Sequence, residues 1–220
     1  MIKIPGTKYS LLSKPSKMPG HSFDLPALSS CPSACGTICD GCYALRGNYR
    51  WPAVKLSQQA RFKWTVETLK KDPVLWAAIV TYAIKESNDV YFRIHSSGDF
   101  FSPLYTKMWF LIAKELPNVK FWAPTKSWLK VTKELLPVVN SNTKLLYWLR
   151  QLNSLPNVTI RPSAINVGDS PPLVKNLAGG SSVSCDSDIF NCPSKNQNNQ
   201  CLDCRFCWDN KNEKVNYKWH

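Results

Sequence analysis

The feature that most constrains this chain is a run of four cysteines near its N-terminus. They stand at Cys31, Cys35, Cys39 and Cys42. Small residues separate them, and Gly36 and Gly41 permit backbone turns that a regular helix or strand would not make. Such turns let several sulfur atoms converge on one point. The run therefore predicts a site for a metal ion or a cluster.

A second cysteine group lies near the C-terminus, at Cys192, Cys201, Cys204 and Cys207. A Cys-x2-Cys-x2-Cys run with one remote cysteine is the ferredoxin arrangement for a 4Fe-4S cluster, and zinc is the alternative at this site. Cys185 is either a further ligand or a small buried side chain. Nine cysteines is an odd number, and eight of them lie in two tight groups, which favours metal ligation in a reducing compartment over a disulfide framework.

Composition bounds the class of protein. The chain has 220 residues, 44% of them hydrophobic, which suits one substantial core. It has no apolar run near the roughly 20 residues that span a bilayer and no secretory signal, so we expect a cytoplasmic protein without a membrane partner. The net charge of +13, whose excess lies before residue 185, favours nucleic acid or another polyanion as a partner.

Strands and helices are expected to alternate along the chain. The patterns predict strands over 21–27, 89–95, 119–123, 158–163 and 181–184, and helices over 52–71, 74–85, 103–116, 129–138 and 143–155. Strands separated by helices form parallel β/α units. We therefore predict an α/β fold, a partial (open) parallel barrel over 1–184, with a cysteine-rich extension over 185–220. Residues 1–20 are expected to be an extended arm outside the core, with Arg61 on the outer face of its helix.

Several strand ends carry polar residues. Parallel units bind ligands beyond the carboxyl ends of their strands, and a period of two places Tyr91, Arg93 and His95 on one face. The cysteine run is expected to share one face of the molecule with these strand ends: Arg93 and His95 with Ser97, Gly98 and Asp99; Thr125 to Ser127; and Arg161 with Ser163.

The spacing Cys35-x3-Cys39-x2-Cys42, followed by Tyr43, resembles the motif of radical S-adenosylmethionine enzymes. In that family three cysteines hold a 4Fe-4S cluster, and the fourth iron takes the amino acid end of S-adenosylmethionine. The run Ser97-Gly98-Asp99 stands where these enzymes place a glycine-rich acidic segment, with Asp in place of Glu and a single Gly. The resemblance implies a barrel like theirs and, with the strand-end residues, a cofactor-binding set of Tyr43, Arg93, His95, Ser97, Gly98 and Asp99.

The role of the fourth cysteine in the run leaves alternatives open. Cys31 could cap the fourth iron, which would close the cluster and leave a centre for electron transfer or structure. Alternatively Cys31, Cys39 and Cys42 are the ligands and Cys35 is spare. A zinc ion held by the four thiols is the third option.

The chain also resembles the phage-associated gene product 88 domain family. The resemblance is carried by the run Pro19–Ala27, the Cys31-Pro32 pair, Cys39-x2-Cys42-Tyr43-Ala44, Arg93–Phe100 and Cys204-x2-Cys207-Trp208. It implies a small iron–sulfur protein, similar to radical enzymes in its barrel, in the cytoplasm of a phage's host.

Two functions from different classes follow. The first is an iron–sulfur protein with two cysteine-bound centres. It would be capable of radical-type redox chemistry when a donor protein supplies electrons. The second is a non-catalytic protein, binding nucleic acid or transferring electrons, whose cluster or zinc sites are structural.

Overall fold

A computed structural model describes residues 2–129, 142–186, 190–211 and 214–219. The helix expected over 129–138 lies almost wholly outside these residues. The other four long helices agree with expectation to within three residues at each end, and a proline marks the start of the first three. Asp72 accepts a hydrogen bond from Leu75 N, and Ser102 from Tyr105 N, each just before a proline. These helices are α2 (Pro52–Lys71), α3 (Pro73–Ser87), α4 (Pro103–Glu115) and α5 (Asn142–Asn153).

The strands form two small parallel sheets. In the first, β1 (Tyr91–Arg93), β2 (Lys120–Thr125) and β3 (Val158–Pro162) lie in that order. In the second, β4 (Ser181–Ser184) pairs with β5 (Val215–Lys218). The strand β5 was not expected from the sequence, and it brings the cysteine-rich segment back onto β4.

Isolated bridges extend this parallel arrangement. Ser163 forms a parallel bridge to Ser181, so the end of β3 adjoins the start of β4. Ser22 forms another with Arg93. The strand expected over 21–27 is reduced to this bridge and a few backbone hydrogen bonds, such as Phe23 N to Ile94 O.

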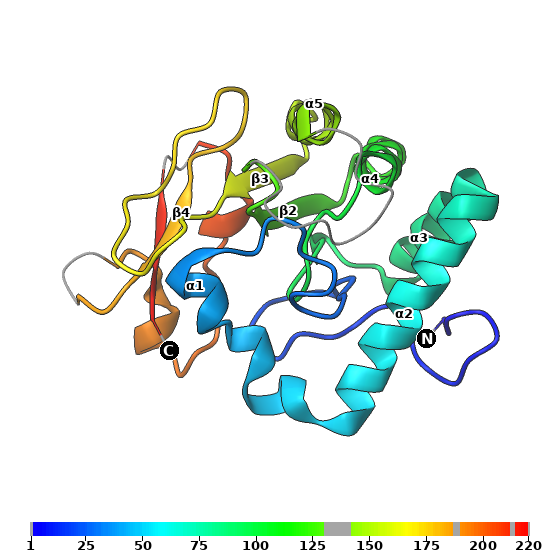
Figure 1. Ribbon diagram of the computed structural model, residues 1–220, viewed down its shortest axis with the longest axis horizontal. Helices are drawn as coiled ribbons and strands as arrows, with labels where there is room; N and C mark the ends of the chain where they lie inside the picture. Colours follow the sequence, from blue (N-terminus) through cyan, green and yellow to red (C-terminus); the bar gives the residue numbers. More distant parts are fainter. Residues whose placement is uncertain (1, 130–141, 187–189, 212–213, 220) are drawn as a thin grey trace.

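The two faces of the first sheet bury different cores. Phe92, Phe121 and Ile160 pack into the large core beneath the helices, which Figure 1 shows in an arc from α3 through α4 to α5. The intervening residue Trp122 packs on the opposite face with Trp208 and two cysteines. This alternation follows the two-residue period of a strand. It leaves one face of the sheet available to the cysteine groups.

The expectations for the N-terminal arm and for Arg61 are wrong. Ile4 and Leu11 are fully buried in the large core. Arg61 is also buried, and it donates to the backbone oxygens of Ser10, Leu11 and Asp24. An irregular segment cannot satisfy its own buried carbonyl groups, so an internal arginine supplies the donors.

The structure contains three-residue and four-residue helical turns, η1 (Tyr43–Leu45), η2 (Gly47–Arg50), η3 (Pro193–Asn196) and η4 (Phe206–Trp208), and the short helix α1 (Gly36–Asp40). All lie in or next to the cysteine-rich segments. None of the helices in the described ranges is both long enough and apolar enough to cross a membrane.

Candidate functional site

Thiols from both cysteine groups line one cavity of about 910 Å³. Cys39 and Cys42 contribute from the N-terminal group. All four members of the C-terminal group contribute as well. Between the two groups the lining is formed by side chains of the strands, among them Arg93, Trp122 and Tyr217.

The N-terminal group is fixed to the carboxyl ends of β2 and β3. Lys126, just after β2, donates to Cys35 O at 2.8 Å and to Ile165 O at 3.2 Å, and its Nζ lies 3.2 Å from Cys39 Sγ. Gly36 has a φ of +71°, and a Cβ there would lie 2.5 Å from Ile165 O. Only a glycine permits this approach at the start of α1.

The thiols of the N-terminal group influence one another electrostatically. The pKa of Cys31 is raised, first by burial and then by the negative charges of Asp99, Cys42 and Cys39. The pKa of Cys42 is raised mainly by burial and also by Cys39, while the cation of Lys126 opposes this rise. Cys31, Cys39 and Cys42 therefore share one electrostatic environment.

The C-terminal group is held against the sheet by a buried arginine. Arg161 is fully buried and donates to the backbone oxygens of Gly179, Phe206, Cys207 and Asp209. Trp208 Nε1 donates to Phe92 O at 3.2 Å. Arg161, predicted to face the site, instead supports the loop that carries the thiols.

The C-terminal thiols also influence one another. Burial raises the pKa of Cys207 to about 12, a rise that the Tyr217 hydroxyl, 3.2 Å from its Sγ, opposes. Burial likewise raises the pKa of Cys201, with Cys192 and Cys204 adding to the rise. Cations are needed to favour the thiolate forms here, and Lys17 and Arg93 both act in that direction on Cys201.

Arg93 lies between the two groups. Its Nη2 donates to Tyr43 Oη at 2.9 Å, next to Cys42 in sequence. Its Nη1 lies 3.4 Å from Met18 Sδ, which packs with Cys201 and Cys207. The guanidinium also stacks over Trp122, 4.5 Å from the ring centroid. One side chain thus contacts the surroundings of both cysteine groups.

The predicted cofactor-binding set is divided by the structure. Tyr43 and Arg93 line the cavity. Asp99 does not: its carboxylate accepts hydrogen bonds from Phe100 N, the Thr125 hydroxyl and Lys126 N, and burial raises its pKa. It ties the chain after β1 to the end of β2, a positioning role.

The other members of that set pack inside the protein. His95 is 1% exposed, and its Nε2 lies 2.8 Å from Tyr105 Oη. Ser97 donates to Leu25 O, and at Gly98, with φ +87°, a Cβ would lie 2.6 Å from Leu25 Cβ. The expectation that His95 shares a face with Arg93 is wrong, because β1 ends at Arg93 and the two-residue alternation ends with it.

Sequence reasoning missed several polar residues of the cavity, among them Asp24 and Gln58. Asp24 is buried, lines the cavity, and accepts hydrogen bonds from the backbone and hydroxyl of Ser96. Gln58 lies on α2 and is 5% exposed. A glutamine within the apolar stripe of a helix was the available indication. No comparable pattern marks Asp24.

Within the described ranges, no group of three or more His, Cys, Asp or Glu side chains is arranged to hold a metal ion. Cys185 is exposed and does not line the cavity.

Fold and site together define a parallel α/β protein with two cysteine groups facing one cavity. A family model described as Gene product 88 matches residues 4–210. The chain therefore belongs to this phage protein family.

Two relatives come from mycobacteriophages, and both are called Gene 88 protein. That of Mycobacterium phage L5 is 31% identical over 104 residues, covering 44% of this chain and 43% of the relative. That of Mycobacterium phage D29 is 32% identical over 105 residues, covering 44% and 42%. The matched region is thus less than half of each relative. No solved structure matches the chain, so its likeness to the radical S-adenosylmethionine barrel stays a prediction.

Proposed function

We propose that this protein is an iron–sulfur protein with two cysteine-bound centres acting on one ligand. The observation that carries the proposal is that thiols of both cysteine groups line the same cavity. Two centres that act on one bound molecule have to lie around one cavity.

The chemistry of the donor set fits such centres. Thiolates are the ligands of iron–sulfur clusters, and each group has cations beside its thiols: Lys126 next to Cys39, and Lys17 and Arg93 near Cys201. Metal binding would draw the thiols together and release their protons, which couples it to local folding.

The residues that would hold the first centre are Cys31, Cys39 and Cys42, with Cys35 as the alternative third ligand. Cys192, Cys201, Cys204 and Cys207 would hold the second, with zinc as its alternative metal. A 4Fe-4S cluster supplies one-electron chemistry and, with one iron unligated by protein, a site for S-adenosylmethionine. Arg93 and Tyr43 would orient a ligand beside this cluster. The protein would act in the host cytoplasm.

The first test counts metals. Anaerobically purified protein should absorb near 400 nm and contain iron in excess of zinc, measured by elemental analysis. Iron at one group and zinc at the other would keep the first centre and assign zinc to the second. Zinc without iron would refute the proposal and favour a structural role.

A second test identifies the ligands of the first centre. Cys31→Ser and Cys35→Ser are compared with Cys185→Ser, whose exposed thiol belongs to neither cysteine group. Loss of iron from Cys31→Ser with iron retained in Cys35→Ser would assign Cys31, Cys39 and Cys42 as the ligands, and loss from both would assign all four thiols. The reverse of the first result would assign Cys35-x3-Cys39-x2-Cys42.

A third test addresses the reaction. Reduced protein is mixed with S-adenosylmethionine, and deoxyadenosine is measured by chromatography. Its formation would support radical chemistry. Its absence, with no change in the paramagnetic signal of the reduced protein, would leave a non-catalytic or electron-transfer role.

A further inference from the structure

Two buried hydrogen-bond donors in the lining of the cavity lack a protein partner. Gln58 Nε2 and Trp122 Nε1 are both buried, on side chains that are 5% and 2% exposed, and no described residue accepts a hydrogen bond from them. Both residues line the cavity. Leaving a buried donor unpaired is unfavourable, because the donor has lost its hydrogen bonds to water. A ligand rich in acceptor atoms would satisfy both donors.

The charged side chains in the lining also indicate what kind of ligand the cavity binds. Asp24 is the sole acid among the described lining residues. Five cations accompany it: Lys14, Lys17, Arg46, Arg93 and Lys218. A cavity lined in this way attracts anions. The ligand should therefore be negatively charged.

Aromatic rings line the cavity. Tyr43 and Tyr49 pack edge to face with their centroids 5.8 Å apart, and Trp51 lies next to them in the lining. Phe206, Trp208, Tyr217 and Trp219 line it as well. Rings combined with cations are the elements that proteins use to stack nucleobases and hold phosphates.

We propose that this cavity binds a nucleotide, either free or as part of a single strand. A nucleotide supplies acceptor atoms, negative charge and a flat ring together. The volume of about 910 Å³ lies within the usual range of ligand pockets, roughly 300–1,000 Å³. The inference goes beyond the proposed function, because the donors, cations and rings are present whichever metal the thiols hold.

The lining also suggests how each part of the ligand is held. Gln58 Nε2 would donate to a ring nitrogen or carbonyl of the base, and Asp24 would accept from an exocyclic amine. Lys17 is half-buried beside the C-terminal thiols and would contact the phosphate. The base would then lie near α2 and the phosphate nearer Cys201.

The test is calorimetric titration of the anaerobically purified full chain. The ligands are adenosine monophosphate, adenosine, inorganic phosphate and a short oligoadenylate. We expect adenosine monophosphate to bind, and adenosine and phosphate to bind at least about tenfold more weakly, since each lacks half of the contacts. Absence of binding by both the monophosphate and the oligonucleotide would overturn the proposal.

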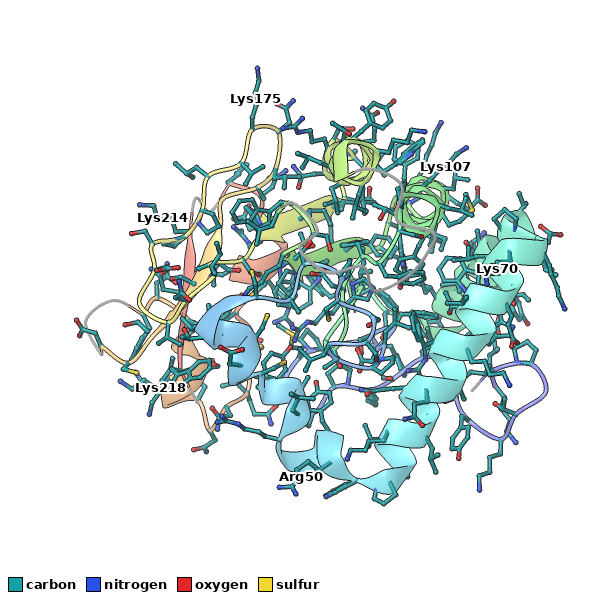
Figure 2. The ribbon with its side chains drawn as sticks, viewed as in Figure 1. Arg50, Lys70, Lys107, Lys175, Lys214 and Lys218 are labelled. Carbon is teal, nitrogen blue, oxygen red and sulfur yellow. The ribbon has the colours of Figure 1, made fainter. Side chains whose placement is uncertain are left out.

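Variants connect the binding to this cavity. Gln58→Met should weaken binding about fivefold, while Gln59→Met, exposed on the same helix, should not. Trp122→Phe removes the second unpaired donor and gives an independent check. Lys17→Met should weaken binding of the monophosphate. Lys175→Met should not, because that side chain points away from the body of the molecule (Figure 2).

The outcomes separate the sources of the ligand and the two proposals. Preference for the monophosphate indicates a free nucleotide, and preference for the oligonucleotide a strand, provided that Gln58→Met weakens the binding. Binding of either that is unaffected by both Gln58→Met and Trp122→Phe would overturn the assignment to this cavity. Iron is counted in every sample, so failure to bind nucleotide is distinguishable from absence of a cluster.

Discussion

At the scale of single residues, His95 illustrates how burial changes a role. Its ring packs against Phe100, Tyr105 and Trp109. Burial, together with the nearby charge of Arg93, lowers its pKa to about 3. The imidazole is therefore neutral in the folded protein at neutral pH, whereas in the unfolded chain it titrates near 6.5.

This difference predicts a pH dependence of stability. Between pH 3 and pH 6.5 the unfolded state binds the proton more readily, so the stabilisation by neutral His95 is complete above pH 6.5 and is lost as the pH falls. From pH 6.5 to pH 5 the free energy of unfolding should drop by up to about 1.4 kcal/mol per pH unit from this group. Denaturant titrations at several pH values give the free energy of unfolding. It should fall more steeply with decreasing pH in the native chain than in His95→Gln. Parallel curves would contradict the lowered pKa.

At the scale of elements, the C-terminal cysteine loop depends on contacts from β3. Arg161 donates hydrogen bonds to four backbone oxygens in the segments around the loop. The Thr159 hydroxyl donates another to Trp208 O at 2.8 Å. The pairing of β5 with β4 closes the segment at its far end. The loop is therefore positioned by the sheet rather than by its own sequence.

Replacing Arg161 with Met should release this loop. Several buried carbonyl groups would lose their donors, at a cost of about 3 kcal/mol or more in the free energy of unfolding. Hydrogen exchange should accelerate at residues 204–209, with the helices little affected. Arg150→Met, which removes a hydrogen bond to Lys175 O, is the matched control and should cost about 1 kcal/mol or less. Equal effects of the two changes would contradict the anchoring role.

Much of the fold is predictable at the element scale. The proline and the polar cap before α4 mark its start, and the β-branched and aromatic run of β3 marks that strand. The strand β5 is only four residues long and is not predictable from its sequence, because it exists only through its pairing with β4. The burial of Arg61 likewise depends on carbonyl groups contributed by a distant segment.

At the scale of the whole molecule, the chain carries a net charge of +13. Figure 2 shows Arg50, Lys70, Lys107, Lys175, Lys214 and Lys218 distributed around the outline of the molecule rather than gathered in one place. Such a distribution creates a general attraction for anions. It does not by itself mark a second binding surface.

The charge predicts different salt dependences for two ligands. Affinity for a mononucleotide should fall modestly between about 50 and 200 mM salt, because few phosphates are contacted. Affinity for the oligonucleotide should fall more steeply if its chain leaves the cavity and follows the basic surface. Fluorescence titrations at several salt concentrations provide the slopes. Equal slopes would show that the surface outside the cavity contributes nothing.

The sequence by itself determined the two cysteine groups, the main helices and strands, and the excess of positive charge, because spacing, local propensity and composition are properties of neighbouring residues. Only the tertiary structure decided that both groups line one cavity, that Arg93 lies between them, and that Asp99 and His95 are turned into the protein. These depend on contacts between distant segments, such as Asp24 with Ser96 and Arg161 with Asp209. No local pattern encodes such contacts.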